Sequence, residues 1–179
     1  IEVFSETIKE NRILNFEKNK KNLFSMIKNE KLYNILNRNF LKKIFFQKKL
    51  IKNEKFYKKI LKEEKYNLII NCESKNYFEK RFFYKKIEKD YKNLAYTTIF
   101  QHSLIENNTA TQIFTKYGPI AFLPLSETQT SIVYSVNLTR GNLNQLNILN
   151  LIKKHNPKYI IKTFGKINKF NLKLSNARN

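Results

Sequence analysis

The chain has 179 residues and a formal net charge of +21, with 35 Lys and Arg against 14 Asp and Glu. This length suits one domain with a core, or two small lobes. The single cysteine, Cys72, excludes a disulfide framework and a cysteine-built metal site. No apolar run approaches the roughly 18 residues that cross a membrane, so we expect no spanning segment.

The basic charge is unevenly distributed. Residues 94–152 contain two basic and two acidic side chains, whereas residues 153–179 contain eight basic and no acidic ones. Such a charge favours nucleic acid or an anionic membrane as partner. Lys, Asn, Ile, Phe and Tyr are abundant, however, while Gly, Pro and Trp are scarce, as AT-rich coding imposes. We interpret most of the charge as composition bias. A membrane-facing surface is the next best account, because each Lys near an anionic leaflet contributes about 1 kcal/mol.

The N-terminal part mixes strand and helix signals. Residues 1–4 predict the end of a strand, and residues 9–22 predict a strand and a turn. Apolar residues then recur at the spacing of an amphipathic helix that begins near Asn29. They are Leu32, Ile35, Leu36 and Phe40. Residues 42–65 alternate Lys with Phe, Ile and Tyr, and they predict helix and strand.

A short apolar run follows at residues 66–71. Its composition predicts a strand that is buried on both faces, with Cys72 as a small hydrophobe at the buried end. The charged residues 79–93 predict a helix or a loop.

The rest of the chain is dominated by strand patterns. Six segments are predicted as strands: 95–104, 109–116, 120–125, 131–136, 158–164 and 170–174. Alternation in the fourth segment places Ile132, Tyr134 and Val136 on one face. Between the fourth and fifth segments, leucines and an isoleucine recur every three residues, which predicts an amphipathic helix with Asn142 as its cap. They are Leu143, Leu146, Leu149 and Ile152. We therefore expect the α+β class, dominated by a mixed or antiparallel sheet.

The two histidines give no metal site. His102 and His155 are far apart in sequence, and no carboxylate or Cys stands at ligand spacing from either. We interpret both as surface or structural histidines.

One hairpin carries a family resemblance. Residues 117–126 read YGPIAFLPLS, residues 131–134 read SIVY, and residues 109–114 before them read TATQIF. This run resembles the substrate-domain core of the flavin-dependent ubiquinone-biosynthesis hydroxylases, which are FAD monooxygenases of the para-hydroxybenzoate-hydroxylase type.

Three further segments are similar to the same family. Residues 24–29 resemble its short strand and Asn before a helix, with Glu30 where the family usually has Arg. Residues 66–76 resemble its buried strand and turn, but the family's Asp-Gly reads Glu73-Ser74 and its Ser reads Tyr77. Residues 170–174 resemble the strand before its second flavin motif.

The resemblance implies a flavin-binding Rossmann-like domain and an antiparallel substrate sheet, with this chain as an internal fragment. Residues 1–27 would lie in the substrate sheet, residues 28–78 in the FAD-binding domain, and residues 79–179 in the substrate-binding domain. It also implies attack of a C4a-hydroperoxyflavin on a prenylated phenol in ubiquinone biosynthesis, with NAD(P)H or another reductant. The flavin does this chemistry, so no catalytic acid–base residue is expected.

The site residues follow from the same resemblance. Glu73 and Asn76 would contact FAD, although both also suit a plain polar turn. The substrate pocket would be lined from two strands of the hairpin, although ordinary sheet packing explains these residues as well. They are Gln112, Phe114, Gly118, Pro119, Phe122 and Pro124.

The main flavin motifs are missing from this sequence. A glycine-rich G-x-G-x-x-G turn lets backbone N–H groups reach the pyrophosphate. Glycine occurs only at positions 118, 141 and 165, and none of these stands in such a motif or in the Gly-Asp motif that contacts the ribityl chain. We expect both motifs, and therefore FAD binding, to require the full-length protein.

Two other readings stay open. A basic RNA-binding protein of ribosomal type would use the Lys–aromatic neighbours at 55–59 and 80–86, but the scarcity of Arg makes nucleic acid the less favoured partner. A flavin-less accessory relative of the same fold would explain the Glu73-Ser74 departure. We expect a cytoplasmic protein, with peripheral attachment to the inner membrane or membership of a quinone-biosynthesis complex as further options.

Overall fold

The computed structural model describes residues 1–7, 12–17, 23–51, 53–73, 75–83, 85–140 and 143–178. These residues form two compact units. The sheet unit contains residues 1–28 and 90–173, and the helical unit contains residues 29–89 with the C-terminal residues from Leu174. The assignment of residues 1–27, 28–78 and 79–179 to substrate and flavin domains stays a prediction.

The described residues contain strands and helices in an α+β arrangement, as expected. The strands are β1 (Glu2–Ser5), β2 (Arg12–Asn15), β3 (Lys85–His102), β4 (Thr111–Thr115), β5 (Gly118–Ser126), β6 (Gln129–Asn137), β7 (Ile161–Phe164) and β8 (Asn168–Arg178). The helices are α1 (Asn29–Leu41), α2 (Glu54–Lys62), α3 (Tyr77–Phe82), α4 (Gln145–Lys154) and the 3₁₀ turn η1 (Leu138–Arg140).

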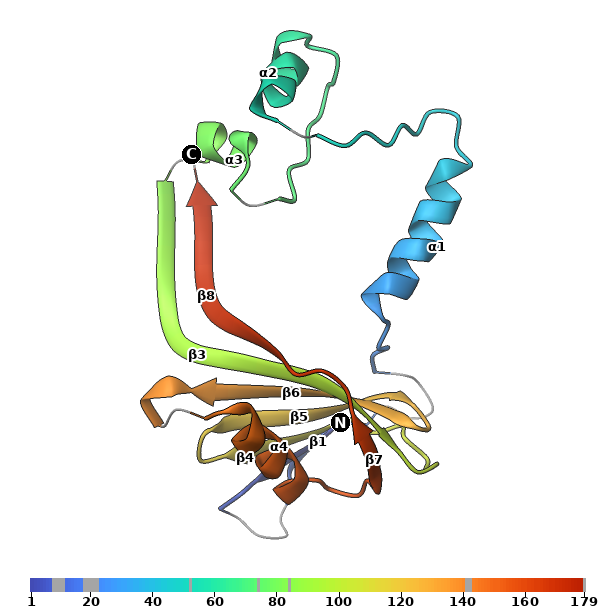
Figure 1. Ribbon diagram of the computed structural model, residues 1–179, viewed down its shortest axis with the longest axis vertical. Helices are drawn as coiled ribbons and strands as arrows, with labels where there is room; N and C mark the ends of the chain where they lie inside the picture. The colour runs from blue at the N-terminus through green and yellow to red at the C-terminus, as the bar shows by residue number, and fades with distance from the viewer. Residues whose placement is uncertain are drawn as a thin grey trace. The chain divides into compact units, whose positions relative to one another are not determined.

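The described strands form one eight-stranded sheet. Its order is β2-β1-β4-β5-β6-β3-β7, and β8 pairs with β3 (Figure 1). Strand β1 pairs with β4 in parallel, while β4, β5, β6 and β3 pair with one another antiparallel. The predicted strands at 95–136 are thus confirmed. The sheet is mostly antiparallel, and its link to a FAD enzyme fold stays a prediction.

Strand alternation and α4 together build the core of the sheet unit. In β6 the side chains of Ile132, Tyr134 and Val136 are buried, as the alternation predicts, and Ile148 and Ile152 of α4 pack against the same face. The core side chains are Leu94, Tyr96, Phe100, Ile120, Phe122, Ile132, Tyr134, Val136, Ile148, Ile152 and Tyr159. Burial of this apolar set is the main stabilising contribution to the unit.

The helix at 143–152 is confirmed, but its cap and its buried face differ from the prediction. Asn144 is the N-cap, in a capping box with Asn147, whereas the predicted cap Asn142 lies outside the described residues. Ile152 of the predicted set is buried, and so is Ile148, which lies outside that set, whereas Leu146 is largely exposed. The three-residue spacing of the leucines drifts around a helix of 3.6 residues per turn, so the i, i+4 isoleucine pair faces the core instead.

The predicted buried strand at 66–71 is wrong. The structure has no strand there, and Leu68 and Ile70 are about three-quarters exposed. A strand buried on both faces needs neighbouring strands, and the described residues of 29–84 contain only helices and connecting segments. Cys72 is accordingly exposed rather than buried at a strand end.

The charged regions also correct the prediction. Within the described part of 42–65 the structure has α2 but no strand, because Phe56, Tyr57 and Ile60 recur at helical spacing behind the Asn53 cap. Residues 85–93, expected as helix or loop, begin β3. Residue 85 and residues 87–92 are exposed, so no apolar alternation marks this part of β3 as a strand.

Helix α1 is confirmed at its predicted start, Asn29, and has no buried residue. Among the described residues, no helix has the length and apolar content that crossing a membrane requires.

Candidate functional site

The face of the sheet opposite α4 carries half of the predicted pocket residues. Register pairs Phe114 with Pro119 and Gln112 with Ala121, so these four side chains share one face. Gln112 and Pro119 are half-buried, and Phe114 is exposed. Among the described residues of the sheet unit, α4 is the one α-helix, and it packs against the other face.

A cavity of about 270 Å³ lies at this opposite face. Gln112, Ala121 and Leu123 line it from β4 and β5, and Phe24 and Met26 line it from the segment that precedes α1. Most of the wall is apolar, and the side-chain amide of Gln112 is a polar group that can fix the orientation of a ligand. We call this space the Gln112 cavity.

The other predicted pocket residues lie on the α4 face. Strand alternation turns Gly118, Phe122 and Pro124 away from Gln112, and Phe122 is completely buried in the core. Phe122 stacks on Tyr159, with ring centroids 6.1 Å apart. The structure therefore does not bring all six residues together, and their roles toward a ligand stay predictions.

The local backbone geometry requires glycine at position 118. Its φ of +141° lies in a region that L side chains rarely adopt, and a Cβ built there would lie 2.2 Å from the Ser135 carbonyl oxygen of β6. The glycine thus allows β5 to begin in close contact with β6.

Pro124 contributes to a second, more polar space. A cavity of about 580 Å³ opens where the hairpin ends, and Pro124 and Asn107 line it together with Phe24 and Met26, which also line the Gln112 cavity.

The predicted cofactor residues Glu73 and Asn76 lie together in the helical unit. Asn76 is the N-cap of α3, and its Oδ1 accepts from the Glu79 backbone N–H at 3.0 Å. Its Nδ2 donates to Asn71 Oδ1 at 2.6 Å, and Tyr57 donates to the Glu73 carboxylate at 3.4 Å. Ser74, the other altered turn residue, lies outside the described residues.

These residues do not fit the pyrophosphate of FAD. The acceptor oxygen of Asn76 is engaged in capping, and Glu73 would repel a phosphate. Gly118 and Gly165 both belong to the sheet unit, and Gly141 lies outside the described residues. The described residues of 29–89 therefore offer no glycine that would let a dinucleotide approach a helix N-terminus.

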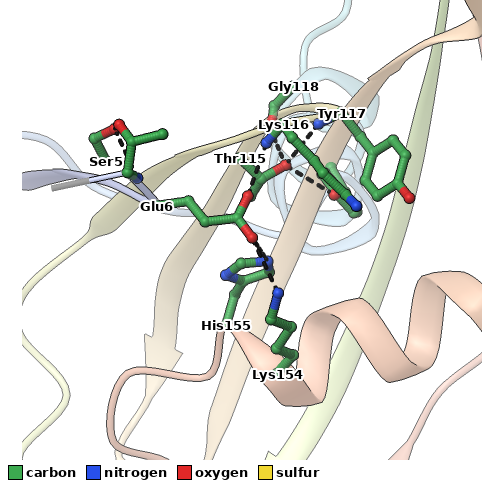
Figure 2. A network of polar contacts seen from close by, with 10 residues as sticks. Ser5, Glu6, Thr115, Lys116, Tyr117, Gly118, Lys154 and His155 are labelled. Atoms are coloured by element: carbon green, nitrogen blue, oxygen red, sulfur yellow. Dashed lines mark hydrogen bonds and ion pairs between the residues drawn. The ribbon is translucent and has the colours of Figure 1, made fainter. Parts of the chain in front are cut away.

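A polar cluster that the sequence did not predict joins β1 to the α4 end (Figure 2). The Glu6 carboxylate accepts from the Lys116 backbone N–H at 2.8 Å and from Lys154 Nζ at 3.0 Å. His155 Nε2, which is buried, lies 3.7 Å from the same carboxylate. More than a hundred residues separate Glu6 from these partners, so no local sequence pattern marks the cluster.

The cluster holds Glu6 charged and His155 neutral. The hydrogen bond from the Lys116 backbone, followed by Lys154 and His155, lowers the pKa of Glu6 against the opposing effect of its burial. Burial lowers the pKa of His155, although the nearby Glu6 opposes this. The arrangement fastens β1 to the hairpin and to α4.

His102 is a structural histidine. Its Nδ1 lies 2.8 Å from the Ser103 carbonyl oxygen, which can only accept, so Nδ1 carries the proton. Nε2 then accepts from Thr130 at 3.1 Å, Asn107 donates to Thr130 Oγ1 at 3.0 Å, and Tyr159 donates to Asn107 at 2.9 Å. Each group in this buried chain has a partner.

The described residues contain no group of three or more His, Cys, Asp or Glu that could hold a metal ion.

Comparison with known proteins gives no matching family model and no matching curated protein.

Proposed function

We propose that this chain supplies the substrate-facing sheet of a FAD-dependent monooxygenase that hydroxylates a prenylated phenol in ubiquinone biosynthesis. The FAD would be held by parts of a longer protein, since the described residues do not fit its pyrophosphate. The reductant would be NAD(P)H or another two-electron donor.

The Gln112 cavity carries this proposal. A mostly apolar space of about 270 Å³ suits a phenol ring with the start of its prenyl chain, and one amide beside it suits the phenol oxygen. Phe114 and Pro119 extend the same face. The YGPIAFLPLS resemblance falls on β5, which supplies Ala121 and Leu123 to the cavity wall.

The order of the units is compatible with the proposal. The sheet unit is interrupted by residues 29–89, so the chain leaves the sheet and returns to it. A substrate sheet whose chain passes through a second domain requires such an interruption.

The test uses the complete open reading frame that contains this chain. In a bacterial strain without its aerobic ubiquinone hydroxylase, we expect it to restore ubiquinone and to purify with bound flavin. Ala121→Phe fills the cavity and Gln112→Leu removes its amide, so each should lower ubiquinone at least tenfold and leave the flavin bound. Leu138→Phe, at an exposed position in η1, is the matched control and should have no effect.

Restored ubiquinone without bound flavin would show that the hydroxylation does not use flavin and would overturn the FAD-dependent mechanism. Absence of both would overturn the proposal and favour the flavin-less accessory protein. Full activity of both cavity variants would remove the cavity as the substrate site.

A further inference from the structure

A turn after α1 places large apolar side chains where turns normally carry polar ones. The Phe46 backbone N–H donates to the Lys43 carbonyl oxygen at 3.0 Å, so Ile44 and Phe45 are the two central residues of this turn. Ile44 is fully exposed, and Phe45 is 84% exposed. Such positions favour Gly, Pro, Asn and Asp, and no local backbone requirement accounts for Ile-Phe.

The turn is held in place by α1. The Phe46 ring stacks on Phe40, with centroids 5.3 Å apart. Lys48 Nζ donates to Tyr33 Oη at 2.6 Å and lies 5.2 Å from the centroid of the same ring. The segment therefore returns along the helix, and Ile44 and Phe45 form its tip.

Lysines flank the tip on both sides. Lys42, Lys43, Lys48 and Lys49 are exposed. No acidic residue occurs in the sequence between Glu30 and Glu54, so this charge is not neutralised locally along the chain. We call residues 42–50 the lysine-flanked turn.

The preceding helix adds apolar surface. Leu32, Ile35, Leu36 and Phe40 are each 40–46% exposed on α1, where they recur at helical spacing. Leu50, at the other end of the lysine-flanked turn, is 79% exposed. The helical unit thus combines an apolar tip with cationic flanks in the lysine-flanked turn, next to the apolar surface of α1.

We propose that the lysine-flanked turn docks on an anionic lipid bilayer. Ile44 and Phe45 enter the boundary between headgroups and acyl chains, and Lys42, Lys43 and Lys49 bind anionic headgroups around them, while Lys48 holds the turn through Tyr33. This inference stands on the turn alone and does not depend on the hydroxylase proposal.

The side chains favour a bilayer over RNA. Nucleic-acid platforms present aromatic faces for base stacking. Here Phe45 is an exposed ring, but its neighbours do not extend it into a stacking platform: Ile44 and Leu50 are aliphatic, and Phe46 already stacks on Phe40. The lysine-flanked turn also contains no Arg, which is the better bidentate phosphate ligand.

The test is co-sedimentation of the 179-residue chain with vesicles of phosphatidylcholine, with and without phosphatidylglycerol. We expect binding to the anionic vesicles that weakens with salt. The pair Ile44→Ser and Phe45→Ser should lower the partition constant by about tenfold or more, because two large side chains lose their burial. The pair Lys42→Gln and Lys43→Gln should lower it by about fivefold per lysine.

Matched controls lie in the sheet unit. Leu104→Ser and Ile160→Ser change apolar residues that are about 70% exposed, and Lys162→Gln with Lys166→Gln removes two exposed lysines. These variants should bind vesicles as the wild type does. Equal loss in the controls would show that the overall charge, not the turn, causes binding and would overturn the proposal.

Insertion itself has a direct readout. The chain contains no Trp, so Phe45→Trp provides a single reporter at the tip. Its fluorescence should shift to the blue on addition of anionic vesicles and be quenched by brominated lipids. An emission already blue-shifted without vesicles would place the tip in a protein contact, and tighter binding to poly(U) than to vesicles would favour RNA. Either result overturns the bilayer proposal.

Discussion

Asparagine accounts for much of the local order in this protein. Asn53, Asn76 and Asn144 are the N-caps of α2, α3 and α4, and each side chain accepts a backbone N–H of the first turn. Asn107 links Tyr159 to Thr130 inside the sheet unit. Asparagine is thus used at positions where its side-chain carbonyl oxygen satisfies otherwise unpaired donors.

Strand alternation places the six predicted substrate-pocket residues on different faces of the sheet. Gln112 and Phe114 share a face with Pro119, whereas Phe122 belongs to the core. Gln112 lines the Gln112 cavity, Phe114 and Pro119 share its face without lining that cavity, and Phe122 is explained by packing. Asn76 is likewise explained by its cap, which leaves Gln112 as the best-placed polar residue for a ligand.

Gly118 gives the clearest substitution test of a single backbone position. Gly118→Ala introduces both a strained φ and a contact of 2.2 Å with the Ser135 carbonyl oxygen, so we expect a loss of about 3 kcal/mol in the free energy of unfolding. Urea unfolding followed by circular dichroism measures it. Gly165→Ala needs no positive φ, and its Cβ would lie 2.9 Å from the Ile99 carbonyl oxygen, so it should cost less; an equal or larger cost there would contradict the conformational argument.

The elements that were predicted correctly are those whose signals are local. In β6 every second side chain is buried, so alternation alone identified the strand and its face. Residues 66–71 carry an equally clear apolar run, but a run specifies a buried strand only where other strands are present to pair with it. Residues 85–93 form a strand although their charged sequence has no apolar alternation. They belong to β3, which pairs with β8.

Helix α4 depends on its first turn as well as on its apolar face. Asn144→Ala removes the acceptor for the Asn147 backbone N–H at 2.8 Å and should lower the free energy of unfolding by about 1 kcal/mol. Asn150→Ala, at an exposed position inside the same helix, is the control and should be neutral or slightly stabilising. Equal effects at both positions, measured by urea unfolding, would show that the cap contributes nothing.

In the whole molecule, charge and core are separated along the chain. The nearly neutral residues 94–152 supply most of the buried side chains, whereas the cationic residues lie on exposed surface. Composition could therefore locate the core region from sequence. It could not give the parallel pairing of β1 with β4, because these strands are about 110 residues apart and neither carries a pattern that specifies its partner.

Glu6 makes the stability of the contact between the β1 end and the rest of the sheet unit dependent on pH. Its pKa is lowered in the folded chain, so it contributes stability that is complete above its ordinary value of 4.5 and is lost as the pH falls through the folded value. We expect Glu6→Gln to lower the free energy of unfolding by about 1 kcal/mol at pH 7, because the charge-assisted bond to the Lys116 backbone and the pair with Lys154 are weakened.

The difference between wild type and Glu6→Gln should therefore shrink as the pH is lowered below 4.5 in a series of urea titrations. His155 also loses its neutral state on acidification, below its ordinary value of 6.5, and loss of the Glu6 charge lowers its pKa further in Glu6→Gln. A difference in the free energy of unfolding that stays constant across this range would mean that Glu6 stabilises the fold through the packing of its side chain and not through its charge. The β1 strand would then be held by its backbone pairing with β4 and β2.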